Sequence, residues 1–151
     1  MHPRILFVIA LLGICSLTCP AQDRGYWNPA SSSASSITGD VAIYKDRATI
    51  NLVSFTIVRV RDLTPAEAAA AFDADINAGQ TGTLYHLNVP ATQRFAHKNT
   101  LCGTESTQWM ATFVTGKTMQ VAFFSGPDTP VFSFEALRSS PDLCGTYSYA
   151  R

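Results

Sequence analysis

The chain has 151 residues, and its 11 Lys and Arg residues balance 11 Asp and Glu residues at a formal net charge of zero. This length is typical of a single domain, and the neutral balance gives no electrostatic basis for binding nucleic acid or an anionic membrane. Charged residues make up 15% of the chain and apolar residues 46%. We therefore expect a compact domain with its own hydrophobic core.

The first 21 residues have the pattern of a secretory signal peptide. A positive charge precedes the apolar run of residues 5–15, and Cys19 and Ala21 are small residues suited to a cleavage site after Ala21. The run is too short for a transmembrane helix, which needs about 20 apolar residues, and no later segment resembles a membrane anchor. We predict a periplasmic or secreted protein without a transmembrane anchor. The alternative is a lipoprotein acylated at Cys19 or Cys15.

Cys102 and Cys144 lie in two copies of the same motif, Leu-Cys-Gly-Thr, and are the cysteines that remain after cleavage. In an oxidising compartment such a pair usually forms a disulfide. A zinc site would need more ligands, and neither His86 nor His97 has finger-like spacing from a cysteine. A redox pair is expected as Cys-x-x-Cys. We therefore predict a disulfide between Cys102 and Cys144.

Downstream of the signal peptide, composition divides the chain into two parts. Residues 22–39 include a serine-rich run and are expected to form a flexible N-terminal lead-in. Residues 40–151 are expected to form a single β-rich domain. Tyr26 and Trp27 in the lead-in either strap the edge of the domain or form an exposed contact, since large aromatic side chains gain most from burial.

Most of the elements expected along the chain are strands. They cover residues 41–44, 48–60, 81–89, the two arms of a hairpin within 107–126, residues 131–137 and residues 143–149. The 48–60 segment is apolar on both faces and is expected to be central in the sheet. Gly116-Lys117 is a two-residue hairpin turn, and residues 143–149 are expected to form an edge strand.

One helix is expected after Thr64. Thr64 is a natural N-cap, Pro65 suits the first helical position, and Glu67 stands where a capping box requires it. Ala69, Phe72 and Ile76 would line the face toward the sheet, and Gly79 would follow the helix end. The predicted fold class is therefore α+β, with a mostly antiparallel sheet of six or seven strands, one helix and one disulfide.

Asp73, Asp75 and Asn77 match the first three ligand positions of a calcium-binding loop. The match then fails, because Ala78 stands where the loop needs glycine and Leu84 where it needs a bidentate glutamate. These residues are more simply the end of the helix. We predict no metal site and no cofactor, with Asp73, Asp75 and Asn77 as the metal candidates to check.

No catalytic residue is predicted. The chain contains neither Gly-x-Ser-x-Gly nor His-Glu-x-x-His. His86 lies on the polar phase of its strand and is expected at the surface, where it joins Tyr26 and Trp27 as a candidate binding surface. Phe123 and Phe124 are adjacent on one strand and must point to opposite faces, so we expect the sheet to be covered on both sides.

Four motifs together resemble a group of small exported bacterial proteins that have no assigned activity. The motifs are ITGDV at residues 37–41, the cysteine and tryptophan of LCGTESTQWM, AFFSG at residues 122–126 and the terminal LCGTYSY. In size, location and strand content the chain is also similar to disulfide-stapled periplasmic inhibitors, such as those of lysozyme. These resemblances imply an exported domain and carry over no catalytic residue, because fold does not determine function.

The function predicted from the sequence is that of an exported, non-enzymatic binding module, such as an inhibitor or an envelope-associated protein. Its partner would be an unidentified protein or envelope component, and no oligomeric state is predicted. The alternatives are a small secreted hydrolase with a site assembled from loops, and a calcium-dependent module.

Overall fold

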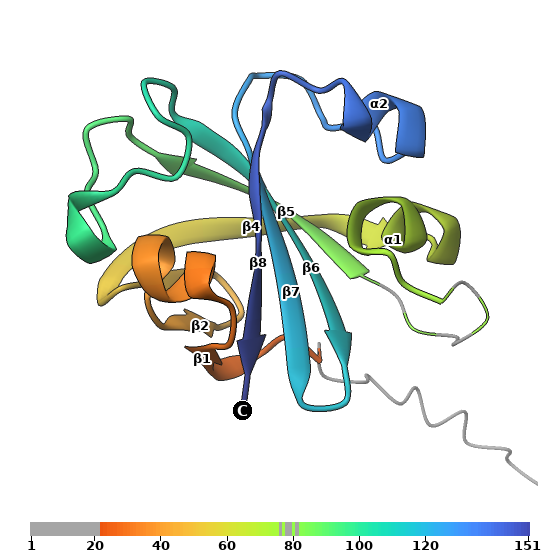
Figure 1. Cartoon of the computed structure of the whole chain (residues 1–151), viewed down its shortest axis with the longest axis horizontal. Coiled ribbons are helices and arrows are strands. Elements are labelled where there is room, and N and C mark those ends of the chain that lie inside the picture. Colours follow the sequence, from red (N-terminus) through yellow and green to blue (C-terminus); the bar gives the residue numbers. More distant parts are fainter. Residues whose placement is uncertain (1–21, 76, 78–79, 81) are drawn as a thin grey trace, which may run out of the picture.

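The computed structural model describes residues 22–151 apart from residues 76, 78–79 and 81. Its eight strands are all antiparallel and follow one another around a closed barrel, in which β8 pairs with β1 (Figure 1). They are β1 (Gly25–Pro29), β2 (Val41–Ile43), β3 (Arg47–Ile50), β4 (Val53–Leu63), β5 (Gly82–Val89), β6 (Thr107–Thr115), β7 (Thr118–Phe124) and β8 (Leu143–Ala150).

The predicted α+β fold with an open sheet of six or seven strands is therefore wrong. One reason is the segment 48–60, which forms two strands instead of one. The chain reverses between β3 and β4 at Asn51 and Leu52, whose φ angles are 45° and 68°. Asparagine tolerates this left-handed region, but leucine rarely adopts it, so the sequence pattern does not reveal the turn.

The second reason is the segment 22–39, which is not a flexible lead-in. It contributes β1, which pairs with both β2 and β8, and a single helical turn, η1 (Ala34–Thr38). Trp27 in β1 is completely buried. Because β1 pairs with both β2 and β8, the sheet closes. The prediction that residues 143–149 form an edge strand is therefore wrong.

Residues 131–137 form no strand either. They contain part of the short helix α2 (Phe134–Arg138), in which the Ser133 hydroxyl accepts a hydrogen bond from the Ala136 amide. Glu135 lies in the first turn and Arg138 in the last, an arrangement that suits the helix dipole. The capping serine and the two charged residues favour a helix here, although the alternation of apolar residues predicts a strand.

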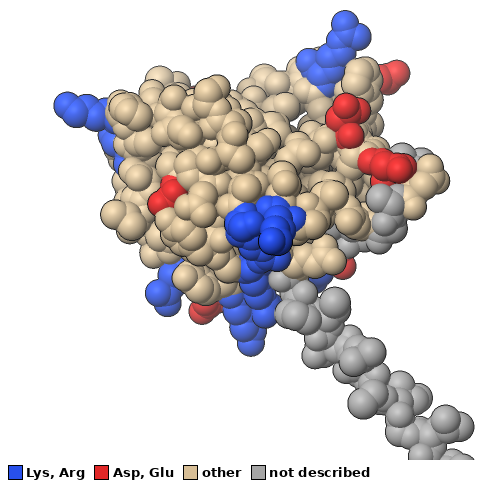
Figure 2. All heavy atoms as spheres, turned by 60° about the horizontal axis from the view of Figure 1, so that its bottom comes forward, with Lys and Arg blue, Asp and Glu red and all other residues tan. Residues whose placement is uncertain are grey.

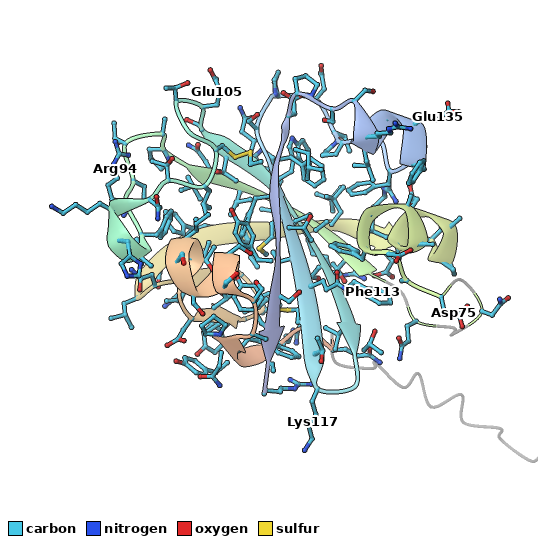
Figure 3. All side chains as sticks on the ribbon, in the orientation of Figure 1. Asp75, Arg94, Glu105, Phe113, Lys117 and Glu135 are labelled. Carbon is cyan, nitrogen blue, oxygen red and sulfur yellow. A yellow bond between two sulfur atoms is a disulfide. The ribbon has the colours of Figure 1, made fainter. Side chains whose placement is uncertain are left out.

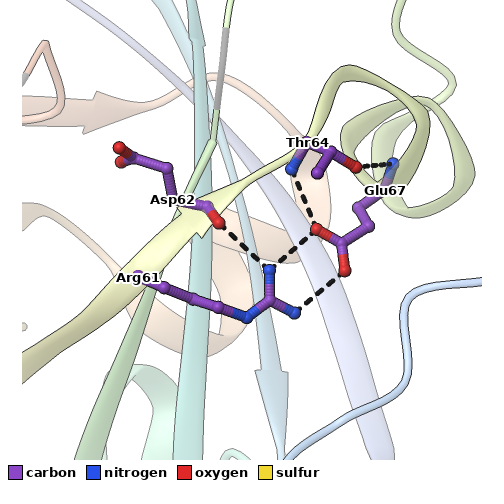
Figure 4. Close-up of polar contacts among 4 residues, drawn as sticks. All are labelled: Arg61, Asp62, Thr64 and Glu67. Carbon is purple, nitrogen blue, oxygen red and sulfur yellow. Dashed lines mark hydrogen bonds and ion pairs between the residues drawn. The ribbon is translucent and has the colours of Figure 1, made fainter.

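Helix α1 (Pro65–Phe72) begins as predicted, with Thr64 and Glu67 forming a capping box. Both carboxylate oxygens of Glu67 also accept hydrogen bonds from the Arg61 guanidinium, at 2.8 and 2.9 Å (Figure 4). This contact ties the helix to the end of β4. The helix ends at Phe72, before the predicted Gly79; Ile76 and Gly79 lie outside the described residues.

Two hydrophobic clusters lie on opposite sides of the barrel wall. The inner cluster fills the barrel and includes Trp27, Val41, Ile43, Ile50, Tyr85, Leu87, Met110, Met119, Val121, Phe123, Tyr147 and Tyr149. The outer cluster lies between the wall and the helices and consists of Leu63, Ala68, Phe72, Leu84, Trp109, Ala111, Phe113, Ala122, Phe124 and Phe132. An eight-stranded barrel is just wide enough for side chains to fill.

Phe123 and Phe124 confirm the expected two-sided covering, because Phe123 belongs to the inner cluster and Phe124 to the outer one. Phe72 of α1 also faces the sheet as predicted: it is 4% exposed and stacks on Phe113 with ring centroids 6.0 Å apart. Burial of one such side chain contributes about 1.5–3 kcal/mol. The outer cluster is therefore a second core that holds α1 against the barrel.

The predicted disulfide between Cys102 and Cys144 is present, with the Cα atoms 5.0 Å apart. Cys102 lies in the long connection between β5 and β6, and Cys144 near the start of β8. The two strands do not start side by side, because β7 lies between β6 and β8. The bond therefore joins the connection to a strand across one end of the barrel.

Within the part of the chain that the structure describes, no helix is long and apolar enough to cross a membrane. Figure 2 turns the lower end of Figure 1 toward the viewer and shows broad uncharged areas with Lys and Arg gathered near the middle.

Candidate functional site

The structure does not bring the predicted surface residues together. Trp27 points into the barrel, whereas its neighbour Tyr26 is 51% exposed and donates a hydrogen bond to Asp40. His86 is exposed, as predicted, and its ring meets the edge of Trp109 with centroids 4.8 Å apart. Since β1 and β5 are not neighbouring strands, these three side chains do not form one surface.

The calcium candidates lie in the segment after α1, where Figure 3 labels Asp75. An oxygen of the Asp75 side chain accepts a hydrogen bond from the Asn77 amide at 2.9 Å, a local turn that asparagine and aspartate commonly form. Among the described residues, no three His, Cys, Asp or Glu side chains are grouped so that they could hold a metal ion.

The described histidines make no hydrogen bond to a serine hydroxyl or a carboxylate. His97 Nδ1 lies 3.2 Å from the carbonyl oxygen of Ser36, and His86 packs on Trp109. Ser125 contacts a carboxylate directly, with its hydroxyl 3.4 Å from Asp142 Oδ1. A serine nucleophile needs an adjacent base, and no imidazole of the described residues occupies that place.

A buried carboxylate closes the lower end of the barrel. Asp23 is 3% exposed, and its Oδ2 accepts hydrogen bonds from the hydroxyls of Tyr85 at 2.7 Å and Thr112 at 2.6 Å. Burial, and then the negative charge of Asp23, raise the pKa of Tyr85 far above its usual range. Tyr85 therefore stays protonated and donates, so the network holds the segment before β1 against β5 and β6.

Arg151, the residue after β8, also contacts the segment before β1. Its guanidinium lies 4.2 Å from the centroid of the Trp27 ring and donates hydrogen bonds to the carbonyl oxygens of Gln22 and Arg24. A cation over a tryptophan face contributes about 0.5–1 kcal/mol where it is exposed and more where it is desolvated. Arg151 therefore links the residue after β8 to β1 and to the segment before it, while Asp23 Oδ1 is buried without a hydrogen-bond partner among the described residues.

The outer surface offers a different environment between the two helices. We call this cavity the α1–α2 groove; its volume is about 280 Å³, and it is lined by Ala70, Ala71, Ala122, Phe124, Phe134, Leu137, Arg138 and Leu143. Ala122 and Phe124 of β7 form its floor and are almost completely buried. The helices α1 and α2 form its walls. Small side chains on α1 and on the floor leave the space open.

The apolar face of α2 is only partly packed, with Leu137 against the outer cluster and Phe134 turned outward. Phe134 is 68% exposed, and no residue of this five-residue helix is fully buried. A second cavity of about 300 Å³ lies on the other side of Phe124 and is lined by residues of the loop before and after α2. The helix α2 is therefore bordered by open space on two sides.

The sequence pattern predicts α1 but does not indicate the groove. Residues 131–137 were predicted to form a strand, so α2, which supplies one wall of the groove, was not expected. The usable signal was Ser133 followed by Glu135 and Arg138, a capping residue with charges that suit a helix dipole. Asp23 was also missed, because it lies in the segment that was expected to be a flexible lead-in.

Comparison of the chain with protein-family models, with curated proteins and with solved structures finds no match. The functional interpretation therefore depends on the geometry of the described residues.

Proposed function

We propose that this protein is an exported, non-enzymatic binding module and that the α1–α2 groove is its binding site. The observation that carries the proposal is the exposed ring of Phe134 on α2, 68% exposed, beside an open groove. Ligand sites are typically concave and mostly apolar, with a few polar groups that orient the ligand. The groove has this composition, with seven uncharged lining residues and Arg138.

The size of the groove limits what it can hold. An apolar cavity of about 150 Å³ accepts one benzene molecule, so a volume of about 280 Å³ has room for a short alkyl chain or one aromatic group with a substituent. A large ligand would extend beyond the groove. We therefore propose a small apolar group as its occupant, either free or as part of a larger partner.

Export is supported by two observations. The first 21 residues have the pattern of a signal peptide, and the Cys102–Cys144 disulfide is typical of oxidising compartments. We propose the periplasm or the medium as the location of the mature protein. Mass spectrometry of the exported protein tests this: a chain that begins at Gln22 is expected, and a chain that retains residues 1–21 would contradict it.

An uncharged apolar probe tests the binding site directly. We expect 1-octanol, titrated into ¹⁵N-labelled protein, to shift the amide signals of α1, α2 and β7, with a dissociation constant of about 1 mM, which corresponds to roughly −4 kcal/mol. The absence of saturable shifts, or shifts confined to other parts of the barrel, would overturn the proposal.

A substitution that fills the groove provides the second arm of the test. Ala70 lines the groove and is only partly buried, so Ala70→Leu should occupy the space of the probe and weaken its binding at least tenfold. The matched control is Ala66→Leu, the same substitution at an exposed position of the same helix that does not line the groove. Alanine and leucine both have high helix propensity, so α1 should remain folded in both variants.

A further inference from the structure

Arg138 is the charged side chain among the residues that line the α1–α2 groove. It lies four residues after Phe134 and one after Leu137, so the three side chains share one face of α2. That face combines two apolar side chains with one cation, and all three border the same cavity.

The Arg138 guanidinium is available to a ligand. Arg138 is exposed, and within the part of the chain that the structure describes its side chain makes no ion pair or side-chain hydrogen bond. Glu135, three residues earlier on α2 and labelled in Figure 3, does not pair with it among the described contacts. A guanidinium carries five N–H donors in a planar fork that matches the two oxygens of a carboxylate.

We infer that the groove binds a small amphipathic monoanion, whose apolar chain lies on Phe124 and Leu137 and whose acid group pairs with Arg138. This inference rests on the proposed function, because it names the ligand class of the same site. A single cation favours one carboxylate over a phosphate or a polyanion, which would need several donors. The floor and the alanines of α1 offer the chain a surface without charge.

The test compares two probes of equal chain length, octanoate and 1-octanol, by amide chemical shifts at low ionic strength. Exposed ion pairs are weakened by salt and contribute up to about 1 kcal/mol, which corresponds to roughly a fivefold change in affinity. We therefore expect octanoate to bind about fivefold more tightly than 1-octanol. Arg138→Gln should remove this preference, so that octanoate and 1-octanol bind this variant with equal affinity.

Lys117→Gln is the matched control, because it removes the same charge from the hairpin turn at the opposite end of the molecule (Figure 3). The preference for octanoate should survive in this variant. Glu135→Gln should increase the preference, since it removes a negative charge beside Arg138.

The outcomes separate the two proposals. If neither probe shifts the groove residues, the proposed function is overturned, and this inference with it. If both probes bind equally, or if Arg138→Gln leaves the preference intact, the groove is an apolar site and the acid-group inference is overturned. A loss of preference in Lys117→Gln that equals the loss in Arg138→Gln would also overturn it, because the effect would then come from overall charge.

Discussion

The lower end of the barrel and the α1–α2 groove each contain an arginine and a large aromatic side chain but differ in how completely they are packed. At the lower end, Trp27 is fully buried, Asp23 is held by two hydroxyls, and Arg151 covers the ring of Trp27. At the groove, Phe134 remains 68% exposed above a cavity of about 280 Å³.

The difference indicates that side chains at the lower end stabilise the fold, whereas side chains at the groove remain available to a ligand. Interiors of folded proteins are packed as densely as organic crystals, and the lower end follows this rule. An exposed aromatic side chain beside an unfilled cavity does not contribute to such packing. Substitutions should therefore affect stability at the lower end and ligand binding at the groove.

The largest effect is expected from Trp27→Ala. Removal of this fully buried ring should lower the free energy of unfolding by roughly 3–5 kcal/mol, as measured by urea denaturation. The matched control is Tyr26→Ala, one position earlier but 51% exposed, which should cost about 1 kcal/mol or less. Equal losses in the two variants would contradict the assignment of Trp27 to the barrel interior.

Phe123 and Phe124 extend the comparison across the barrel wall. Phe123→Ala should cost roughly 3–5 kcal/mol, because the barrel interior cannot collapse around the lost ring. Phe124 borders both outer cavities, so water can fill the space it leaves, and Phe124→Ala should cost about 1 kcal/mol less. A larger loss for Phe124→Ala, by the same denaturation measurement, would mean that the groove is not open in solution.

Asp23→Asn tests the polar half of the lower end. The charged acceptor of the Tyr85 and Thr112 hydroxyls is lost, and hydrogen bonds to charged groups contribute about 1.5–3 kcal/mol. A loss of this size is expected in urea unfolding at neutral pH. Asp46→Asn makes the same change at an exposed turn and should leave stability within about 0.5 kcal/mol of the wild type.

Glu67 links the groove helix to the barrel through a titratable contact. The hydrogen bond from Arg61 holds the pKa of Glu67 below its ordinary value, which is about 4.3. Its contribution to stability is therefore fully present above that value and is lost as the pH falls through the lowered pKa. Glu67→Gln should cost less than about 1 kcal/mol at pH 7.

The pH dependence of the melting temperature measures this contribution. The wild type and Glu67→Gln should differ at neutral pH and converge below the ordinary carboxyl range. A constant difference down to the most acid conditions would show that the Arg61–Glu67 pair does not titrate as proposed.

Phe134→Ala should have the smallest effect on stability, within about 0.5 kcal/mol of the wild type, because the ring is already largely exposed. Its effect on octanol binding should be a several-fold loss. Phe132→Ala, two residues earlier, removes a ring that is 6% exposed and packs edge-on against Phe124 at 5.6 Å. That variant should be clearly destabilised, and similar stabilities for the two would contradict the exposed position of Phe134.

Features encoded by neighbouring residues could be predicted from the sequence. Thr64, Pro65 and Glu67 are sufficient to start α1, and Gly116 with its flanking alternation defines the hairpin of β6 and β7. The disulfide followed from the two cysteines that lie outside the predicted signal peptide. Each of these depends on residues close in sequence or on a single possible pairing.

Barrel closure and the groove depend on contacts that are distant in sequence. The β1–β8 junction involves two paired positions, Asn28 with Ala150 and Pro29 with Tyr149. No local sequence pattern predicts this pairing. The groove requires α1, β7, α2 and β8 together. A short segment such as residues 131–137 has a mixed local preference, so its tertiary surroundings decide whether it becomes helix or strand.

The disulfide also limits how far the protein can be stretched. Cys102 and Cys144 are 42 residues apart in sequence, and the loop between them contains β6, β7 and α2. An extended chain spans at most about 3.3–3.6 Å per residue, so the bond withholds roughly 140–150 Å of contour length from a molecule pulled by its ends. Under tension the first five strands can be pulled out, but the β6–β7 hairpin lies outside the line of force until the disulfide is reduced.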